Sequence, residues 1–593
     1  MEASLFGTVL FAMSNATLFV STFCLRKSKK ILNGVSWLIL SLISVLCYGA
    51  MMAGIVNVIG IPVNIISMGI IYFVTSILLC IVIKKNKKTQ KYKWEVYDFI
   101  YVIVFGFIIF FVSGKYFTSS IQLMFYNSDA AVHFKNAMYV LREQSVTNMF
   151  FAPLHNALIM EMFMPFVAEV NLYKIFILID AAKFLLETLF FMVLIRDFLD
   201  SKTMKIIGFI IAIIYTAGYP MNSYLYSFFY WGLGVMLMGY IMLMLRYYKN
   251  REIDRKIAVV GMMLACGALP VTYMIFGPII YIISFIVLFF IVKKERKIVS
   301  KENIILALKI YAAPTLLAIY YCYFDFLRNS GSTMSNLLNL DGGVYRQLFI
   351  NFIWTLPFVI YMLIKAWKNK KSDEITLFTI FISTITIIMF LFVYKGKIGV
   401  YYFYKLYYPL WLLFHVLTIQ AIKELWVKSK ELIISLSVVF FFLVIMCFGG
   451  LEQKIIDSER AIIQQERTSG IFDLYLFNIW LFEERDLQYP PQYFEICNYV
   501  IEELREEEKE IPLLATIDNY RMCYWYEGIT GQNCKKYYGW LYSFEKVQEK
   551  IAKKQVNYFV VYKDSPIYEE HKAYFEEFEY AFENDYGIVA IVK

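Results

Sequence analysis

The stretch Tyr126-Asn-Ser-Asp-Ala-Ala-Val-His-Phe-Lys-Asn-Ala137 places an acid, Asp129, and a histidine, His133, four residues apart. It lies near the middle of a polar segment, about 114–171, that separates two strongly apolar runs. Polar segments of this length are uncommon between the apolar runs of this chain. The stretch therefore marks a large connection in which ionisable side chains stand outside the apolar part of the protein.

Two helices are predicted within this connection. Ser128 is a suitable N-cap for a helix that runs from Asp129 to about Arg142. At the first turn, the helix dipole favours the ionised carboxylate, which suits a general base or a metal ligand, and His133 shares that face. A solvated acid with an incidental histidine is the alternative interpretation. The apolar segment from Ala152 to Phe166 is short for a membrane span, so we expect a helix that lies at the interface or re-enters the membrane.

The composition on either side of the loop indicates a membrane protein. The chain has 593 residues, of which 60% are hydrophobic and only 18% are charged. Apolar runs of about 20 residues recur, and each is long enough to cross a hydrocarbon core of about 30 Å. The predicted fold class is a polytopic α-helical membrane protein with a C-terminal extracytoplasmic α/β domain. The basic residues behind the net charge of +9 sit in short clusters between spans, so they indicate topology and no nucleic-acid partner.

The charge pattern sets the predicted topology. The clusters Arg26–Lys30 and Lys84–Lys93 are expected to be cytoplasmic, which places the N-terminus outside and the segment 114–171 on the outer face. Continuing the alternation gives about 14 spans with both termini outside. The hairpins at 204–247 and 257–292 are the places where this count is most easily wrong by two. The other predicted spans with assigned bounds are 5–25, 31–54, 63–83, 97–113, 172–195, 304–324 and 432–447.

The composition changes to acidic and less apolar from residue 449. We therefore divide the chain into an N-terminal three-span addition, 1–96, a transmembrane core, 97–448, and a soluble extracytoplasmic domain, 449–593. Alternating helix and strand patterns in the tail predict a small α/β layer domain. Its predicted elements are a helix at 493–510, a strand at 513–517, a helix at 542–554, a strand at 558–562, a helix at 569–582 and a strand at 587–592.

Two motifs of the first loop resemble those of a known superfamily. Asp129 at the start of an amphipathic helix, followed by Ala152-Pro-Leu-His155, resembles the first outer loop of the GT-C glycosyltransferases. These polytopic enzymes include protein O-mannosyltransferases, oligosaccharyltransferases and arabinosyltransferases. Ala152 stands where the superfamily motif often has a proline. The three spans before the one that leads into the loop are an addition to the basic pattern, which has one span there.

The segment Lys395–Pro409 looks like the late Tyr/Lys-rich segment of several members of the superfamily. Lys397 and Lys405 could neutralise a lipid phosphate, and Tyr401 and Tyr402 could stack on a sugar. An aromatic belt with snorkelling lysines explains the same residues without a ligand. Arg346, in an outer polar loop, is a further candidate for holding the anionic part of a donor.

The resemblance implies an enzyme of the multi-pass cell membrane. It would transfer a sugar, with inversion, from a polyprenyl-phosphate donor to a glycan, lipid or protein acceptor on the outer face. Asp129 would act as the general base, and His133 and His155 would line the site. Many members have a second acid, whereas Asp129 stands alone, so no cofactor is assigned and dependence on a divalent metal stays open. The candidates for a second acid are Glu161, Glu169, Asp325 and Asp341.

A transporter, such as a lipid-linked saccharide flippase, is the alternative function. Asp180, Lys183 and Glu187 lie on one face of a predicted span, and ionisable groups inside a membrane mark either an ion pathway or a structural ion pair. A membrane protein with a non-catalytic outer binding domain is a third interpretation. The nine cysteines form no CxxC pair, and the chain has no P-loop and no HExxH motif.

Overall fold

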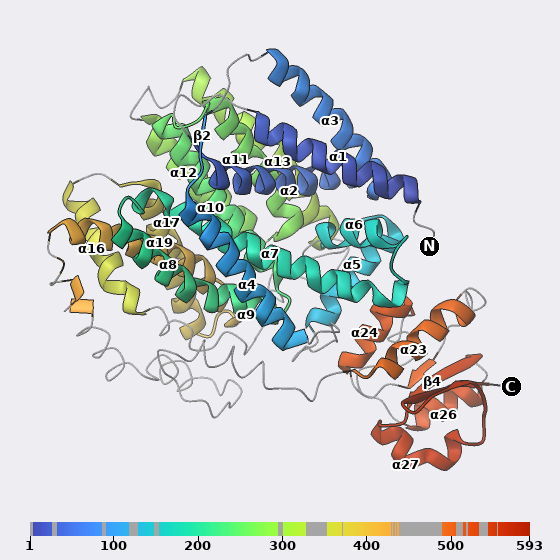
Figure 1. The fold of residues 1–593 in the computed structure, drawn as a ribbon. Coiled ribbons are helices and arrows are strands. Elements are labelled where there is room, and N and C mark those ends of the chain that lie inside the picture. The colour runs from blue at the N-terminus through green and yellow to red at the C-terminus, as the bar shows by residue number, and fades with distance from the viewer. Residues whose placement is uncertain are drawn as a thin grey trace.

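The computed structural model shows a bundle of long helices joined to a small α/β part (Figure 1). The bundle is formed by the earlier part of the sequence and the α/β part by its end. The α/β part packs against the helix at 129–143, in the first loop. The structure describes residues 4–25, 32–85, 91–117, 129–146, 153–274, 276–293, 300–327, 353–369, 372–428, 430, 433–434, 436–437, 489–505, 514–516, 520–532, 544–553 and 556–592.

Ten helices of the described residues are long and apolar enough to cross a membrane, which makes this a multi-pass membrane protein. They correspond to ten of the predicted spans. The total of about 14 stays a prediction, because 432–447 lies mostly outside the described residues and three further helices of the bundle are not among these ten. The ten are α1 Leu5–Cys24, α2 Gly34–Val58, α3 Ile65–Lys85, α4 Val96–Phe117, α8 with α9 (Lys202–Ala217 and Tyr219–Leu225), α10 Phe229–Asn250, α11 Arg255–Thr272, α12 Phe276–Lys293, α13 Lys301–Ile319 with the π-helical turn η3 Tyr320–Leu327, and α17 Glu374–Tyr394.

Three further helices belong to the same bundle. The first carries several charged residues, and the second is short. Short 3₁₀ turns adjoin some of these helices, and a five-residue helix lies between α17 and the last of the three. These elements are α7 Leu172–Ile195, α16 Leu356–Asn369, α19 Tyr407–Lys428, the turns η2 Arg196–Phe198 and η4 Ile353–Thr355, and α18 Tyr401–Lys405.

Several bundle helices begin at a polar cap on the same end of the bundle. A side-chain oxygen of each cap residue accepts a backbone N–H of the first turn, which satisfies one of the donors that a helix N-terminus leaves free. The cap residues are Asn33 for α2, Ser201 for α8, Asp254 for α11, Ser300 for α13 and Asp373 for α17.

Ion pairs join the connections at that end. Lys205 Nζ lies 2.7 Å from Glu95 Oε2, and Lys249 Nζ lies 2.7 Å from Glu374 Oε1. Arg246 pairs with an acid of the connection 196–205. We call this region, made of residues 196–205, 246–256, 365–369 and 372–374, the basic end. Three of the predicted cytoplasmic clusters lie in these segments, so for them the charge pattern and the packing of the helices agree on which helix ends lie together.

The first loop folds as the sequence predicts, where it is described. Its helices are α5 Asp129–Glu143 and α6 Leu154–Phe163, and η1 Glu169–Asn171 leads into α7. Ser128, the predicted cap, lies outside the described residues. α6 packs against α7, α5 packs against α6, and the Phe134 ring of α5 lies 5.6 Å from the Phe176 ring of α7, so the described helices of the loop are part of the folded structure.

The C-terminal part contains a four-stranded sheet in the order β3-β4-β6-β5. β3 Leu514–Thr516 pairs with β4 Tyr558–Tyr562 in parallel, and β6 Gly587–Ile591 pairs antiparallel with both β4 and β5 Glu579–Glu583. The helices of this part are α23 Pro491–Tyr499 with the π-helical turn η5 Val500–Leu504, α24 Tyr520–Thr530, α26 Phe544–Ala552 and α27 Pro566–Phe575.

The sequence prediction was wrong at 569–582. The helix there ends at Phe575, and the residues after 578 form β5 instead. Charged and aromatic residues in this segment suit a helix in isolation, but β5 finds a partner in β6 through a tight turn in which Asn584 N donates to Gly587 O at 3.0 Å. Strand pairing therefore outweighed local preference. The helix α24 was also missed.

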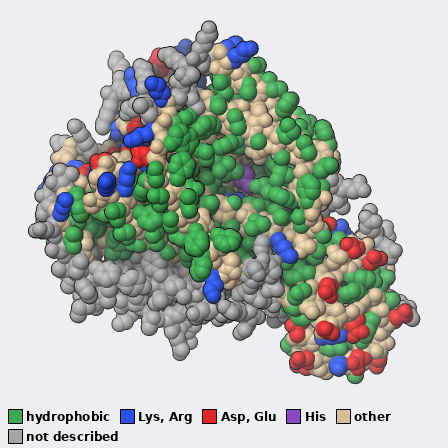
Figure 2. Space-filling view, in the orientation of Figure 1, with side chains coloured by type: hydrophobic (Ala, Val, Ile, Leu, Met, Phe, Trp, Pro, Cys, Tyr) green, Lys and Arg blue, Asp and Glu red, His purple; other side chains and the backbone are tan. Residues whose placement is uncertain are grey.

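Side chains of different kinds cover the two parts. Figure 2 shows a mostly hydrophobic surface over the helical bundle and many acidic side chains over the α/β part. A hydrophobic surface suits helices that face lipid, whereas charged side chains suit contact with water. The α/β part therefore has the surface of a domain that lies outside the membrane.

Candidate active site

α5 presents Asp129 and His133 toward the interior of the molecule. Asp129 is the first residue of the helix, and His133 lies one turn further on, almost wholly buried. The same helix buries Ala130, Phe134 and Met138, which hold it against its neighbours. The alternative interpretation, a freely solvated acid with an incidental histidine, does not fit the burial of these side chains.

Lys405, the last residue of α18, lies in the same neighbourhood as Asp129 and His133. Its side chain is only 2% exposed, and its charge affects the pKa of both residues of α5. A buried lysine is rare unless an opposite charge or a ligand compensates it. The tertiary fold therefore brings an acid of the first loop and a cation of the late Tyr/Lys-rich segment together.

Aromatic rings surround the Lys405 ammonium group. Nζ lies 4.1 Å from the ring centroid of Tyr401, 5.2 Å from that of Tyr230 and 5.3 Å from that of Tyr273. These distances suit cation–π contacts. Nζ also donates to Tyr230 Oη at 3.3 Å, and the His133 ring lies 5.0 Å from the ring of Tyr230. We call Asp129, His133, Tyr230, Tyr273, Tyr401 and Lys405 the Asp129–Lys405 cluster.

Elements far apart in the sequence build this cluster. Tyr230 stands in the first turn of α10, and Tyr273 follows the last residue of α11. Trp231 Nε1 of α10 donates a hydrogen bond to Lys405 O at 3.1 Å, which connects α18 to α10. The sequence analysis missed Tyr230 and Tyr273. Both lie at breaks between apolar helices, and such breaks on the predicted outer side were the available signal.

Burial changes the protonation of the cluster. Burial raises the pKa of Asp129, and the nearby charge of Lys405 opposes that rise. Burial lowers the pKa of Lys405 to about 7, with Asp129 acting in the other direction. Burial and the Lys405 charge lower the pKa of His133 to about 3, so its imidazole is neutral near pH 7. The sequence argument expected the helix dipole to keep Asp129 ionised, whereas in the structure Lys405 is the group that opposes its protonation.

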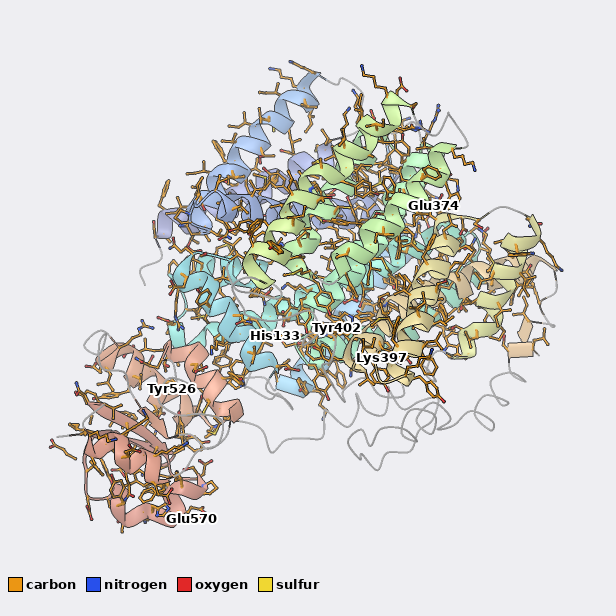
Figure 3. All side chains as sticks on the ribbon, turned by 180° about the vertical axis from the view of Figure 1, so that it is seen from behind. His133, Glu374, Lys397, Tyr402, Tyr526 and Glu570 are labelled. Carbon is orange, nitrogen blue, oxygen red and sulfur yellow. The ribbon has the colours of Figure 1, made fainter. Side chains whose placement is uncertain are left out.

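The other predicted donor-binding residues are distributed differently. Tyr402 is buried, with its ring 5.1 Å from that of Tyr401. Lys397 is exposed in the turn before α18, and no contact with the cluster is found for it among the described residues. In Figure 3, His133, Tyr402 and Lys397 lie toward the end of the bundle opposite Glu374. Arg346 lies outside the described residues.

His155 belongs to a second polar cluster. Its Nε2 lies 3.0 Å from Leu46 O of α2, and burial followed by the charge of Lys183 lowers its pKa to about 4. Asn156 Nδ2 donates to Asp180 Oδ1 at 3.1 Å, and Lys183 donates to Asn156 Oδ1. Lys183 Nζ lies 3.8 Å from Asp180 Oδ1, so the predicted acid–base ladder of α7 contains a buried ion pair supported by hydrogen bonds.

The two clusters meet at Phe229. Lys183 Nζ lies 4.1 Å from the centroid of the Phe229 ring, and the His133 ring lies 5.8 Å from it on the other cluster's side. Glu187 Oε1 is buried without a hydrogen-bond partner among the described residues, beside a cavity of about 20 Å³ that could hold one water molecule. The cavity is therefore too small for a sugar. Asp180, Lys183 and Glu187 of α7 form a buried polar core next to the Asp129–Lys405 cluster.

The candidates for a second acid have other partners where they are described. Glu161 Oε2 accepts Ile65 N at 3.1 Å at the start of α3, and Glu169 accepts from Arg142 at 3.0 Å and from Arg505 at 2.8 Å. The side chains of Asp325 and Asp341 lie outside the described residues. Within the described part of the chain, no three His, Cys, Asp or Glu side chains gather in a metal-binding arrangement.

No protein-family model and no curated protein sequence matches the chain. A similar solved structure is the archaeal oligosaccharyltransferase AglB from Archaeoglobus fulgidus, in complex with an inhibitory peptide and a dolichol-phosphate. The two chains are 11% identical, and the similarity covers 81% of this chain and 71% of that one, with a TM-score of 0.42. Oligosaccharyltransferases are among the enzymes that the motifs of the first loop resemble.

Proposed function

We propose that this protein is an integral-membrane glycosyltransferase that uses a polyprenyl-phosphate-linked sugar. The acceptor would be a hydroxyl group on the outer face of the membrane. The observation that carries the proposal is the burial of Lys405 beside Asp129, inside a ring of tyrosines. A base, a cation and aromatic surfaces in one place are what sugar transfer from a phosphate needs.

The reaction follows from the chemistry of these groups. Asp129 accepts the proton of the acceptor hydroxyl, whose oxygen forms a bond to the anomeric carbon of the donor sugar. The bond between that carbon and the phosphate oxygen breaks with inversion, and the polyprenyl phosphate leaves. Lys405 lies where it can neutralise the charge of the leaving phosphate. Tyr230, Tyr273 and Tyr401 offer ring faces for the sugar.

His133 has a supporting role in this proposal. Its imidazole is neutral near pH 7, so it can donate or accept a hydrogen bond but adds no charge. Because the ring is neutral, the charge that opposes the rise in the pKa of Asp129 is that of Lys405. Lys397 and Arg346 remain candidates for contacts with more distant parts of the donor, and His155 supports the neighbouring core.

Transfer activity of the purified protein tests the proposal. The assay uses lipid vesicles, a panel of radiolabelled polyprenyl-phosphate sugars and acceptor extracts. Asp129→Asn keeps the size of the side chain and removes the base, so we expect transfer to fall by about 10²- to 10⁴-fold. Glu143→Gln, on the exposed end of the same helix, is the matched control and should leave transfer unchanged.

Three outcomes of this assay bear on the proposal. Loss of transfer in Asp129→Asn, with unchanged elution and thermal unfolding, supports the role of a base. Full transfer by Asp129→Asn with a good donor would falsify that role. Absence of transfer by the unaltered protein with every polyprenyl-phosphate sugar would count against the donor class.

A further inference from the structure

A second cavity lies at the basic end, away from the Asp129–Lys405 cluster. It has a volume of about 410 Å³, within the range of small-molecule sites. Its walls come from α1, α2 and α3 of the N-terminal addition on one side and from α10 and α11 on the other. The lining includes Leu18 of α1, Leu25 directly after α1, Leu40 of α2 and Leu79 of α3.

The walls of this cavity are made mainly of apolar side chains. Five of the polar side chains in them, Ser41, Ser44, Tyr48, Thr75 and Tyr240, have hydrogen-bond partners in the wall. Ser44 Oγ lies 2.7 Å from Tyr240 Oη, Tyr48 bonds to Thr75, and Ser41 Oγ donates to Trp37 O at 2.8 Å. A polar ligand would lose its water without gaining partners, which is costly. The chemistry of the walls therefore selects an apolar chain.

The cavity reaches the surface at a cation. Lys256, the second residue of α11, lines it and is exposed, and Val260, one turn further on, lines it and is 46% exposed. The acid at this rim, Asp254, accepts the backbone N–H of Lys256 at 2.9 Å as the cap of α11. Arg255, the residue before Lys256, lies over the ring of Tyr248, with Cζ 4.6 Å from the ring centroid. Lys256 has no ion-pair partner among the described residues, so its charge is available to an anion.

We propose that this cavity holds a hydrocarbon chain of an anionic glycerophospholipid, with the lipid phosphate at Lys256. The lipid would come from the leaflet that faces the basic end, because basic segments attract anionic lipids there. Its chain fills the space between the three-helix addition and α10 and α11. The bound lipid packs between these two sets of helices, and its binding is independent of the proposed transfer reaction.

Native mass spectrometry of the full-length protein, released from vesicles of mixed phosphatidylglycerol and phosphatidylcholine, tests the proposal. Leu79→Trp fills the cavity, and we expect retained phosphatidylglycerol to fall about tenfold, the change for about 1.4 kcal/mol of binding free energy. Leu78→Trp is the matched control, because Leu78 is 58% exposed on the same helix and does not line the cavity. Its lipid retention should equal that of the unaltered protein.

The headgroup is tested separately. Lys256→Gln should reduce the preference for phosphatidylglycerol over phosphatidylcholine by about fivefold, the effect expected for one cation near anionic lipid. Lys293 is exposed at the end of α12 and lies outside the cavity, so Lys293→Gln should leave the preference for phosphatidylglycerol unchanged. Retention of phosphatidylcholine or an isoprenoid lipid in preference to phosphatidylglycerol, or equal loss in Leu78→Trp and Leu79→Trp, would overturn the proposal.

Discussion

At the scale of single residues, Lys405 and Asp129 depend on one another. Lys405 is almost fully buried, and a cation in such a place is unfavourable unless an anion is near. Asp129 supplies part of the compensation, and each group shifts the pKa of the other in opposition to burial. A donor phosphate would add a second anion beside Lys405. The residue-scale arrangement is therefore one that a phosphate ligand completes.

The pH dependence of transfer follows from the lowered pKa of Lys405. An ordinary lysine keeps its charge to about pH 10.4, but burial lowers the pKa of Lys405 to about 7. Its charge is therefore lost as the pH rises through about 7 in the free protein. We expect kcat/KM to fall across that range, since this parameter reports groups of the free enzyme. Initial rates from pH 5 to pH 9 measure it.

Lys405→Arg separates this group from others that titrate. Arginine stays charged across the range, so the fall in kcat/KM above pH 7 should disappear even if the maximum rate is lower. Lys368→Arg, at an exposed position of α16, is the control and should keep the profile of the unaltered protein. An unchanged fall above pH 7 in Lys405→Arg would assign the titration to another group.

At the scale of elements, a strained turn before α10 sets where the aromatic residues of the cluster stand. Ser227 has a positive φ of 58°, a conformation that residues other than glycine rarely adopt. Its Oγ donates to Asp180 Oδ2 at 2.8 Å, so the buried acid of α7 holds the turn. Tyr230 follows three residues later. The polar core of α7 thus positions one wall of the Asp129–Lys405 cluster.

Substitutions at Ser227 test this relation. Ser227→Ala loses the hydrogen bond to a charged partner and keeps the strained φ, so we expect a loss of about 1.5–3 kcal/mol in the free energy of unfolding. Ser227→Gly loses the same bond but adopts a positive φ freely, so it should be more stable than Ser227→Ala by about 1 kcal/mol. Denaturant unfolding in detergent micelles measures both. Equal stability of the two variants would mean that φ at this turn carries no cost.

At the scale of the whole molecule, the α/β part packs on the helix that bears Asp129. The ring of Trp525 in α24 lies 5.3 Å from that of Phe134, and Lys135 forms an ion pair with Glu527. Gly528 permits this approach, because a Cβ there would lie 2.8 Å from Phe134. Arg142 Nη2 donates to Ile529 O at 2.8 Å at the other end of α5. The tail thus holds α5 along its length.

Removing the Trp525 ring should therefore impair the site from a distance. Trp525→Ala deletes a buried aromatic side chain, which costs about 3–5 kcal/mol. We expect a lower unfolding temperature and at least a tenfold loss of transfer, because α5 loses support while Asp129 remains. Trp367→Ala, at an 86% exposed position of α16, is the matched control. Unchanged transfer by Trp525→Ala would show that α5 holds its place without the tail.

Much of the architecture could be predicted from local patterns. Apolar runs, polar caps and basic clusters are properties of short segments, so the bundle helices, α5, α6 and most of the tail elements were predictable. The strand β5 was not, because its identity depends on pairing with β6. Helix α24 was also missed, and its apolar face is matched to α5, a segment almost 400 residues earlier in the chain.

The candidate site divides in the same way. Asp129, His133 and the lysines of 395–409 could be selected from residue type and position, but Lys405 and Lys397 looked equivalent in the sequence. Packing distinguishes them, because Lys405 lies among Tyr230, Tyr273 and Tyr401, whereas Lys397 stays exposed. Residue chemistry and hydropathy are local and can be read along the chain. Proximity between distant segments is decided by how the helices pack, and only the tertiary structure holds that information.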